Sequence, residues 1–259
     1  MIPSILLGFI AKFERKPTVT VGNNVEKLTE HAGKHLNELL AANKDEPVLL
    51  LLSGGSALKL ISFISPDSLG KNATVGVLDE RYNQDPKVNN FTQVKALIDT
   101  LLKDKQGDKC SFIDTSVKVG ETQQELSLRF DKSLKEWRAK FPKGKIIITQ
   151  GVGPDAHTSG IMPFRDKTEK EYFNSTFVDT DKWVVDYDAA GKNDYPLRVT
   201  TTIPFLVNEV DHSIVFATGK HQAFADLRNK DLDLADAPCK SVFAMKEVMI
   251  FTDEEVLFD

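Results

Sequence analysis

The sequence has few cysteines, no long apolar run and no excess of basic charge. Its two cysteines, Cys110 and Cys239, are too few among 259 residues for a disulfide framework or a cysteine-rich zinc site. We expect both to be reduced thiols. No stretch reaches the roughly 18 apolar residues that a membrane-spanning helix needs. The short apolar run at residues 5–10 has basic residues after it and none before it, the reverse of a secretory signal. These absences predict a cytoplasmic protein without a membrane anchor.

The charge balance argues against one class of partner. Lys and Arg number 33 and Asp and Glu number 38, which gives a formal net charge of −5. A mildly acidic chain does not favour nucleic-acid binding through bulk charge, but a few focused cations still suffice for a small anion. There is no internal repeat or long Pro/Gly/Ser linker. We therefore expect an N-terminal extension over residues 1–16 and a single domain over residues 17–259.

Short apolar runs alternate with amphipathic segments. Continuous apolar runs of this kind indicate strands that are buried on both faces, as in a parallel sheet. Alternating strands and helices predict an α/β fold with a mostly parallel central sheet and helices on both faces, doubly wound and Rossmann-like. The expected strands are residues 48–52, 74–78, 146–149 and 214–217, and the expected helices are residues 25–40, a segment from residue 57, residues 121–137 and residues 221–227.

The polar and glycine-rich motifs follow these strands directly. In open α/β sheets, ligands bind beyond the carboxyl ends of the strands, so motifs far apart in sequence are expected to meet in one crevice. After the first strand come Ser53, Gly54, Gly55 and Ser56, and then a helix. Glycines allow close backbone approach and a helix start offers free N–H groups, so this loop suits a phosphate. A tight strand-to-helix turn is the alternative.

Charged residues follow the second strand and open a later one. In the run Asp79-Glu80-Arg81, alternation along a strand places Asp79 and Arg81 on one side and Glu80 on the other. Residues 198–204 read as a strand with Arg198 at one end, and arginine makes forked contacts with phosphate. An exposed salt-bridge cluster and a surface arginine on an edge strand are the alternatives.

The segment after the third strand is the most informative. Residues 151–158 read Gly-Val-Gly-Pro-Asp-Ala-His-Thr. Asp155 stands two residues from His157, so its carboxylate is placed to orient the imidazole, and a neutral histidine is a suitable general base. A surface histidine on a turn is the alternative. His31 and His35 stand four apart on the first helix, but no carboxylate lies between them, so we expect a solvated helix edge and no metal site.

Together these motifs resemble the 6-phosphogluconolactonase and glucosamine-6-phosphate isomerase/deaminase superfamily. Order and rough spacing hold from about residue 17 to residue 256. The matching pieces are residues 52–56, residues 78–82 with Asn90-Phe91, residues 151–158 with Pro163, residues 198–200 and Ala237-Pro238.

The resemblance implies a sugar phosphate as the partner and no cofactor or metal. It implies that His157 is the base and that Asp155 helps it. Asp79 matches the aspartate that the isomerase branch uses to move a proton. The implied substrate- and phosphate-binding residues are Ser53, Gly54, Gly55, Ser56, Arg81, Gly153, Arg198 and Lys220.

Individual residues near the matching motifs distinguish the lactonase branch of the superfamily from the deaminase branch. The deaminase branch has a glutamate just before the proline that follows the catalytic histidine, whereas this chain has Met162 before Pro163. Asp-Glu-Arg also resembles the lactonase branch, because deaminases usually show Asp-Glu-Tyr. The resemblance therefore implies an enzyme that hydrolyses 6-phosphogluconolactone to 6-phosphogluconate in the pentose phosphate pathway. A deaminase or aldose–ketose isomerase and a divergent, non-catalytic sugar-phosphate binder stay open.

The chain departs from the family pattern at three places near the predicted site. Ala156 replaces a glycine, and a positive φ at that position would strain the loop beside the base. Gln222 stands where the family usually has a lysine, with Lys220 and His221 as the nearest cations. Phe164-Arg165 stands where a glycine usually follows the proline.

Overall fold

The computed structural model describes residues 15–105 and 110–255, so most of the predicted extension, residues 1–14, lies outside the described residues. Within the described part, the strands form one sheet of seven and one of three. None of the described helices is long and apolar enough to cross a membrane.

The larger sheet is parallel throughout, as predicted. All its neighbouring strands pair in the same direction. Every residue of its interior strand β2 is buried, which explains why that strand reads as an unbroken apolar run. The order is β1 (Thr18–Val21), β10 (Glu247–Thr252), β9 (His212–Ala217), β6 (Lys145–Gln150), β2 (Val48–Leu52), β3 (Ala73–Val77) and β5 (Ser111–Phe112).

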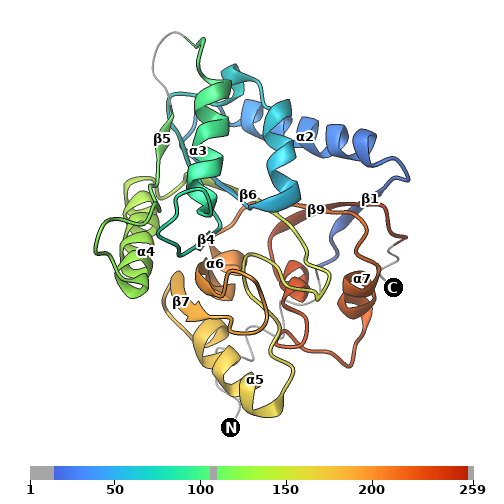
Figure 1. Ribbon diagram of the computed structural model, residues 1–259. Helices are drawn as coiled ribbons and strands as arrows, with labels where there is room; N and C mark the ends of the chain where they lie inside the picture. The colour runs from blue at the N-terminus through green and yellow to red at the C-terminus, as the bar shows by residue number, and fades with distance from the viewer. Residues whose placement is uncertain (1–14, 106–109, 256–259) are drawn as a thin grey trace.

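Helices cover both faces of this sheet, and the alternation along β2 shows it. Leu50 and Leu52 pack into one apolar cluster, whereas Leu49 and Leu51 pack into the other. The first cluster lies under α2 (Val25–Ala42), η1 (Gly55–Phe63) and α3 (Asn90–Leu101), which cover the upper side in Figure 1. The second includes residues of α4 (Gln123–Lys140), α6 (Ile203–Asn208), α7 (His221–Arg228) and η4 (Pro238–Phe243).

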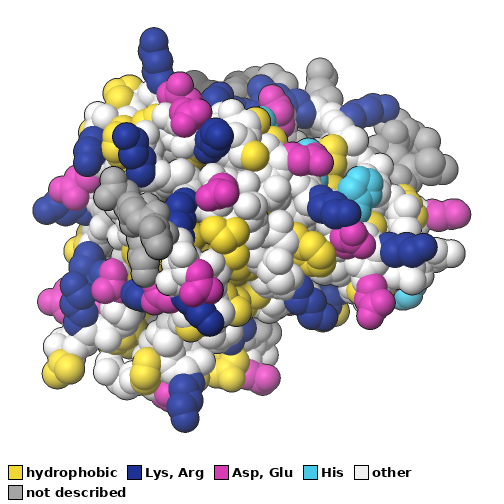
Figure 2. Space-filling model, turned by 90° about the horizontal axis from the view of Figure 1, so that it is seen from above, with side chains coloured by type: hydrophobic (Ala, Val, Ile, Leu, Met, Phe, Trp, Pro, Cys, Tyr) yellow, Lys and Arg dark blue, Asp and Glu magenta, His cyan; other side chains and the backbone are white. Residues whose placement is uncertain are grey.

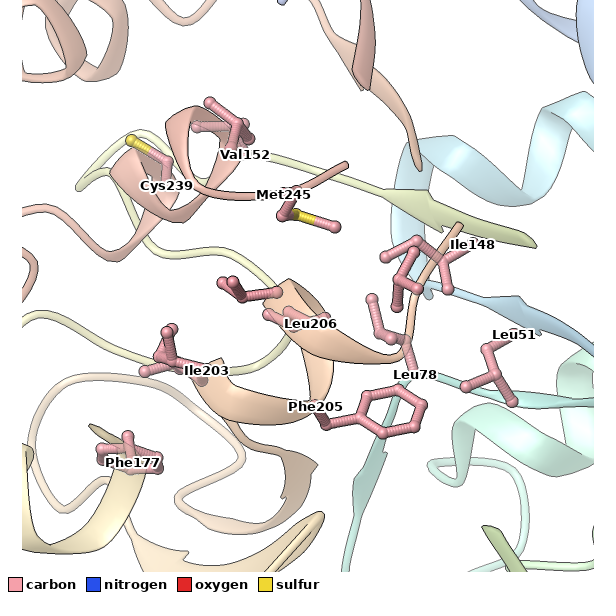
Figure 3. Close-up of a cluster of buried hydrophobic side chains, with 14 of the residues drawn as sticks. Leu51, Leu78, Ile148, Val152, Phe177, Ile203, Phe205, Leu206, Cys239 and Met245 are labelled. Atoms are coloured by element: carbon pink, nitrogen blue, oxygen red, sulfur yellow. The ribbon is translucent and has the colours of Figure 1, made fainter. Parts of the chain in front are cut away.

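The second cluster is the larger core. Figure 3 shows Phe205 and Leu206 of α6 beside Leu78, with Leu51 and Ile148 on the adjacent strands. The short helices α5 (Lys167–Phe173) and η3 (Asn174–Val178) add Phe173 and Phe177 to the same cluster. The predicted doubly wound architecture is therefore confirmed. The short 3-10 helix η2 (Pro66–Ser68) completes the elements on the other face.

The second, antiparallel sheet was not predicted. Its order is β4 (Asp79–Arg81), β8 (Leu197–Thr201) and β7 (Val184–Asp188). The charged run Asp-Glu-Arg is therefore a strand of its own and not the end of the preceding one. The expected strand over 198–204 was too long, because β8 ends at Thr201 and Thr202 caps α6, whose first turn contains Pro204. The expected helix from residue 57 is a 3-10 helix that begins at Gly55.

The connectivity places a crevice between β2 and β6. From β2 the chain builds outward through β3 and β5, and it then returns to β6 on the other side of β2. Such a reversal leaves the loops after the two central strands diverging, and ligands bind at that switch point. Residues 53–56 follow β2 and residues 151–158 follow β6. The fold thus brings the two most informative motifs to the same place.

Candidate active site

One cavity of about 210 Å³ opens at this switch point. Ten of the eleven residues predicted for the site line it, and Asp155 stands directly behind His157. The lining residues are Ser53, Gly54, Gly55, Ser56, Asp79, Arg81, Asn90, Gly151, Val152, Gly153, Pro154, His157, Ser159, Gly160, Arg198 and Lys220.

The loop after β2 presents backbone donors to the cavity. Gly55 has a φ of +71°, a conformation that favours glycine, and it opens η1. The first N–H groups of a helix have no partner within it. The Ser53 N–H donates to Thr149 Oγ1 at 3.1 Å, which ties the end of β2 to that of β6. This geometry suits an anion near residues 54–56.

His157, which lines the cavity, forms a close pair with Asp155. Asp155 Oδ1 lies 2.6 Å from His157 Nδ1 and 3.3 Å from the backbone nitrogen of the same residue. The ring lies so near Gly153 that a Cβ there would be 2.0 Å from Nδ1. Glycine at 153 is therefore required by the position of the imidazole.

The contact between Asp155 and His157 favours one tautomer of the imidazole ring. Burial alone raises the pKa of Asp155, but the hydrogen bonds and charge of His157 outweigh it and hold that pKa below its ordinary value. An ionised Asp155 accepts a hydrogen bond from Nδ1–H of a neutral imidazole. The proton-free Nε2 is then the atom that can accept a proton from water or substrate.

Asp79 and Arg198 form a buried ion pair at the base of the cavity. Arg198 Nη1 lies 3.1 Å from Asp79 Oδ2, and both side chains are 6% exposed. Arg198 Nη2 donates to Asn193 Oδ1 at 3.0 Å. Two of its three guanidinium nitrogens are thus engaged and Nε has no hydrogen-bond partner, so a forked phosphate contact by Arg198 would have to replace one of these two bonds. Arg198 is also not on an edge strand, since β8 is the middle strand of its sheet.

Two other cations are better placed to receive an anion. Arg81 is half-buried, its Cζ lies 4.7 Å from the centre of the Tyr195 ring, and its Nε has no hydrogen-bond partner. Lys220 precedes α7, and its ammonium makes no hydrogen bond or ion pair to a residue that the structure describes. An incoming phosphate would therefore not have to displace an internal carboxylate at either position.

Glu80 has a role that the sequence did not reveal. It is completely buried and faces away from the cavity, as strand alternation predicts. Its carboxyl accepts from the backbone N–H groups of Arg81, Asn90 and Phe91 and from the Thr115 hydroxyl. The run Asp-Glu-Arg therefore combines two cavity residues with one residue that fixes the start of α3.

Other contributors were also missed. Asn90 and Ser159 line the cavity, and each has one buried oxygen, Oδ1 and Oγ respectively, without a hydrogen-bond partner. Asn193 and Tyr195 hold the two arginines from the loop between β7 and β8. Only Asn90 belonged to a recognised motif. The other three stand in ordinary polar contexts that carry no local signal.

The alanine at 156 is strained, as the sequence suggested. Ala156 is buried and has a φ of +73°, a left-handed conformation that costs a residue with a Cβ about 1–2 kcal/mol. Among the described residues, no group of three or more His, Cys, Asp or Glu side chains is arranged to hold a metal ion. His31 and His35 both lie beside the Phe251 ring.

Comparison with known proteins shows which family the chain belongs to. Residues 23–251 match the family model described as glucosamine-6-phosphate isomerases/6-phosphogluconolactonase. The chain belongs to this family. No curated protein gives a significant match over the sequence. The resemblance inferred from the motifs is therefore confirmed by the family model.

Solved structures share the fold at low identity. A 6-phosphogluconolactonase from Shewanella baltica OS155 has a TM-score of 0.71 and 18% identity, covering 92% of this chain and 97% of its own. The enzyme of that name from Trypanosoma brucei has a TM-score of 0.68 and 19% identity, with 93% and 98% covered. The one from Plasmodium vivax has a TM-score of 0.67 and 14% identity, with 99% and 97% covered.

Proposed function

We propose that this member of the family hydrolyses 6-phosphogluconolactone to 6-phosphogluconate, with His157 as the general base. The observation that carries the proposal is the 2.6 Å contact between Asp155 Oδ1 and His157 Nδ1. The same cavity holds Arg81 and Lys220, neither of which has a carboxylate partner among the described residues. The names of the structural neighbours support the same reaction. Met162 before Pro163, in place of the deaminase glutamate, supports it too.

The reaction follows from the positions of these groups. Nε2 of His157 removes a proton from water as the water oxygen attacks the lactone carbonyl carbon. Charge develops on the carbonyl oxygen, and donors in the cavity stabilise that oxyanion. The tetrahedral intermediate collapses with cleavage of the bond to the ring oxygen, which takes the proton back from the imidazolium. The product is the open hydroxy acid, and His157 is neutral again.

The phosphate is held away from the reacting carbon. We assign it to the backbone donors of residues 54–56 together with Arg81 and Lys220, because neither cation has an internal carboxylate partner among the described residues. Binding the remote phosphate places the ring against His157. Arg198 acts through Asp79, whose position it fixes.

A turnover panel tests the assignment. Fresh 6-phosphogluconolactone, glucosamine 6-phosphate, and ribose and hexose phosphates are each incubated with the enzyme, and spontaneous opening of the lactone is subtracted. We expect turnover of the lactone alone. Turnover of glucosamine 6-phosphate without lactone hydrolysis would establish the isomerase or deaminase alternative. Binding without any turnover would establish a non-catalytic sugar-phosphate binder.

A further inference from the structure

Arg165 connects the loop of the proposed base to helix α7. Its Nη2 donates to the backbone carbonyl of Asp155 at 3.3 Å and to Asp226 Oδ2 at 2.8 Å. Asp226 is 6% exposed, and its Oδ1 accepts from Gln222 Nε2 at 2.8 Å. The buried carboxylate of Asp226 thus joins Arg165 and Gln222. Both of these residues stand at positions where the chain departs from the family pattern.

This contact acts on the strained part of the loop. Arg165 holds the carbonyl that precedes Ala156, and the Cys239 N–H donates to the Ala156 carbonyl at 3.0 Å. The Ala156 N–H donates to the Gly153 carbonyl at 3.1 Å. The peptide groups on both sides of Ala156 are therefore fixed from outside. A left-handed alanine persists only where its surroundings determine the backbone in this way.

The conformation of Ala156 sets the relation between its two neighbours. Asp155 and His157 stand on either side of it, and in this backbone conformation Asp155 Oδ1 lies 2.6 Å from His157 Nδ1. Relaxation of Ala156 to a negative φ would rotate the Asp155 carboxylate away from the imidazole. The same carboxylate network also touches α7, which begins directly after Lys220.

We propose that Arg165, held by Asp226 and Gln222, is a positioning residue that compensates for the alanine at 156 and keeps Asp155 against His157. The resemblance gives the family a glycine at the position of Ala156 and another after the proline, where this chain has Phe164-Arg165. Glycine adopts a positive φ without strain and needs no such support. This inference rests on the proposed function, because it assigns how the base is held.

A double-mutant cycle between the two positions tests the inference. Arg165→Ala is expected to lower kcat for lactone hydrolysis by about 10- to 100-fold, the effect of a modest misplacement of a reacting group. KM should change less than about twofold, since the phosphate contacts are untouched. Ala156→Gly should retain activity, and Arg165→Ala/Ala156→Gly should recover most of the lost kcat. Arg165 is a largely exposed side chain, so its variant is expected to fold.

The matched control is Arg138→Ala. Arg138 also bridges a backbone carbonyl, that of Gly144, and a carboxylate, that of Glu209, but it lies outside the cavity. Its loss should lower the midpoint of urea unfolding without changing kcat. A wild-type kcat in Arg165→Ala would overturn the inference, and so would a double variant no more active than Arg165→Ala.

Amide hydrogen exchange provides a readout that does not depend on turnover. In Arg165→Ala, exchange at residues 156–157 should accelerate by about tenfold or more, because the backbone there opens more often. The additional Ala156→Gly change should not accelerate it further. If the wild-type enzyme failed to hydrolyse the lactone, the proposed function would be lost but this comparison would still decide the role of Arg165. Unchanged exchange in Arg165→Ala would contradict it.

Discussion

Arg81 and Arg198 carry the same charge into the cavity but have different neighbours. Arg198 is paired with the buried carboxylate of Asp79, whereas Arg81 lies against the Tyr195 ring and keeps its charge unpaired among the described residues. Arg81 and Arg198 are register partners across β4 and β8, so they reach the same cavity from neighbouring strands. The two arginines should therefore respond differently to removal.

Arg81→Ala is expected to raise KM for the lactone with little effect on kcat. The loss of a charge-assisted contact to the phosphate is worth about 1.5–3 kcal/mol, or roughly 10- to 100-fold in KM. Steady-state kinetics with 6-phosphogluconolactone measure this. A KM within twofold of wild type would remove Arg81 from the phosphate site.

Arg198→Ala is expected to lower stability before it affects binding. Removal of one partner of a buried ion pair leaves Asp79 uncompensated and costs about 3–5 kcal/mol. Urea unfolding of the variant measures this cost. A variant with wild-type stability and a strongly raised KM would instead restore the direct phosphate contact to Arg198.

At the scale of elements, Glu80 links β4 to α3. Its carboxyl accepts from the first two backbone N–H groups of α3 and from Thr115. Burial raises the pKa of Glu80 to about 7, and the four hydrogen bonds oppose that rise without cancelling it. The folded protein thus holds a proton on this carboxyl at pH values where the unfolded chain has lost it.

This difference predicts a pH dependence with a definite sign. The stabilisation is fully present below pH 4.5, the ordinary pKa, and is lost as the pH rises to about 7. The loss amounts to on the order of 3 kcal/mol over that window. Urea unfolding at pH 5, 6, 7 and 8 should show the advantage of wild type over Glu80→Gln shrinking as the pH rises, because glutamine does not titrate. A constant difference would contradict the prediction.

The elements also show how far the sequence allows prediction. Four of the seven strands of the parallel sheet were placed to within a residue or two, because strands buried on both faces are uniformly apolar. Strands β1, β5 and β10 of that sheet were not predicted. Helix α2 begins at Val25, where the apolar periodicity placed its start. The positive φ of Ala156 was predictable from a motif in which glycine is usual.

The parts of the site that could not be predicted depend on contacts between segments far apart in the sequence. Asp79 and Arg198 are 119 positions apart, and no local pattern shows that their strands pair. Asn193 and Tyr195 were missed for the same reason. The end of β8 could be predicted from the sequence, since Thr202 followed by Pro204 is a helix-start signal.

At the scale of the whole molecule, the cavity is lined by residues that belong to both sheets or follow their strands. The larger sheet supplies residues 53–56 and 151–154, and the smaller one supplies Asp79, Arg81 and Arg198. Figure 2 shows acidic and basic side chains interspersed over the face seen from above. Among the described side chains on that face, no extended area of one charge is seen.

A ligand that bridges these parts should stabilise the folded protein. At a concentration 100 times its Kd, 6-phosphogluconate is expected to add about 2.7 kcal/mol to the free energy of unfolding. That corresponds to a rise in Tm of roughly 5–10 °C for a chain of this size. Thermal unfolding with 6-phosphogluconate and with unphosphorylated gluconate separates the contribution of the phosphate. Equal shifts with both would show that the phosphate is not recognised.

The general base is the central claim, and the rate of lactone hydrolysis by His157→Ala tests it most directly. The initial rate is measured by acid release at constant pH, above the spontaneous rate, with His31→Ala as the control for an exposed histidine outside the cavity. We predict that kcat falls by about 10²- to 10⁴-fold in His157→Ala, with KM little changed, and that Asp155→Asn causes a smaller fall. His31→Ala should match wild type. Hydrolysis at the wild-type rate by His157→Ala would contradict the account, and the loop after β6 would then be a structural turn.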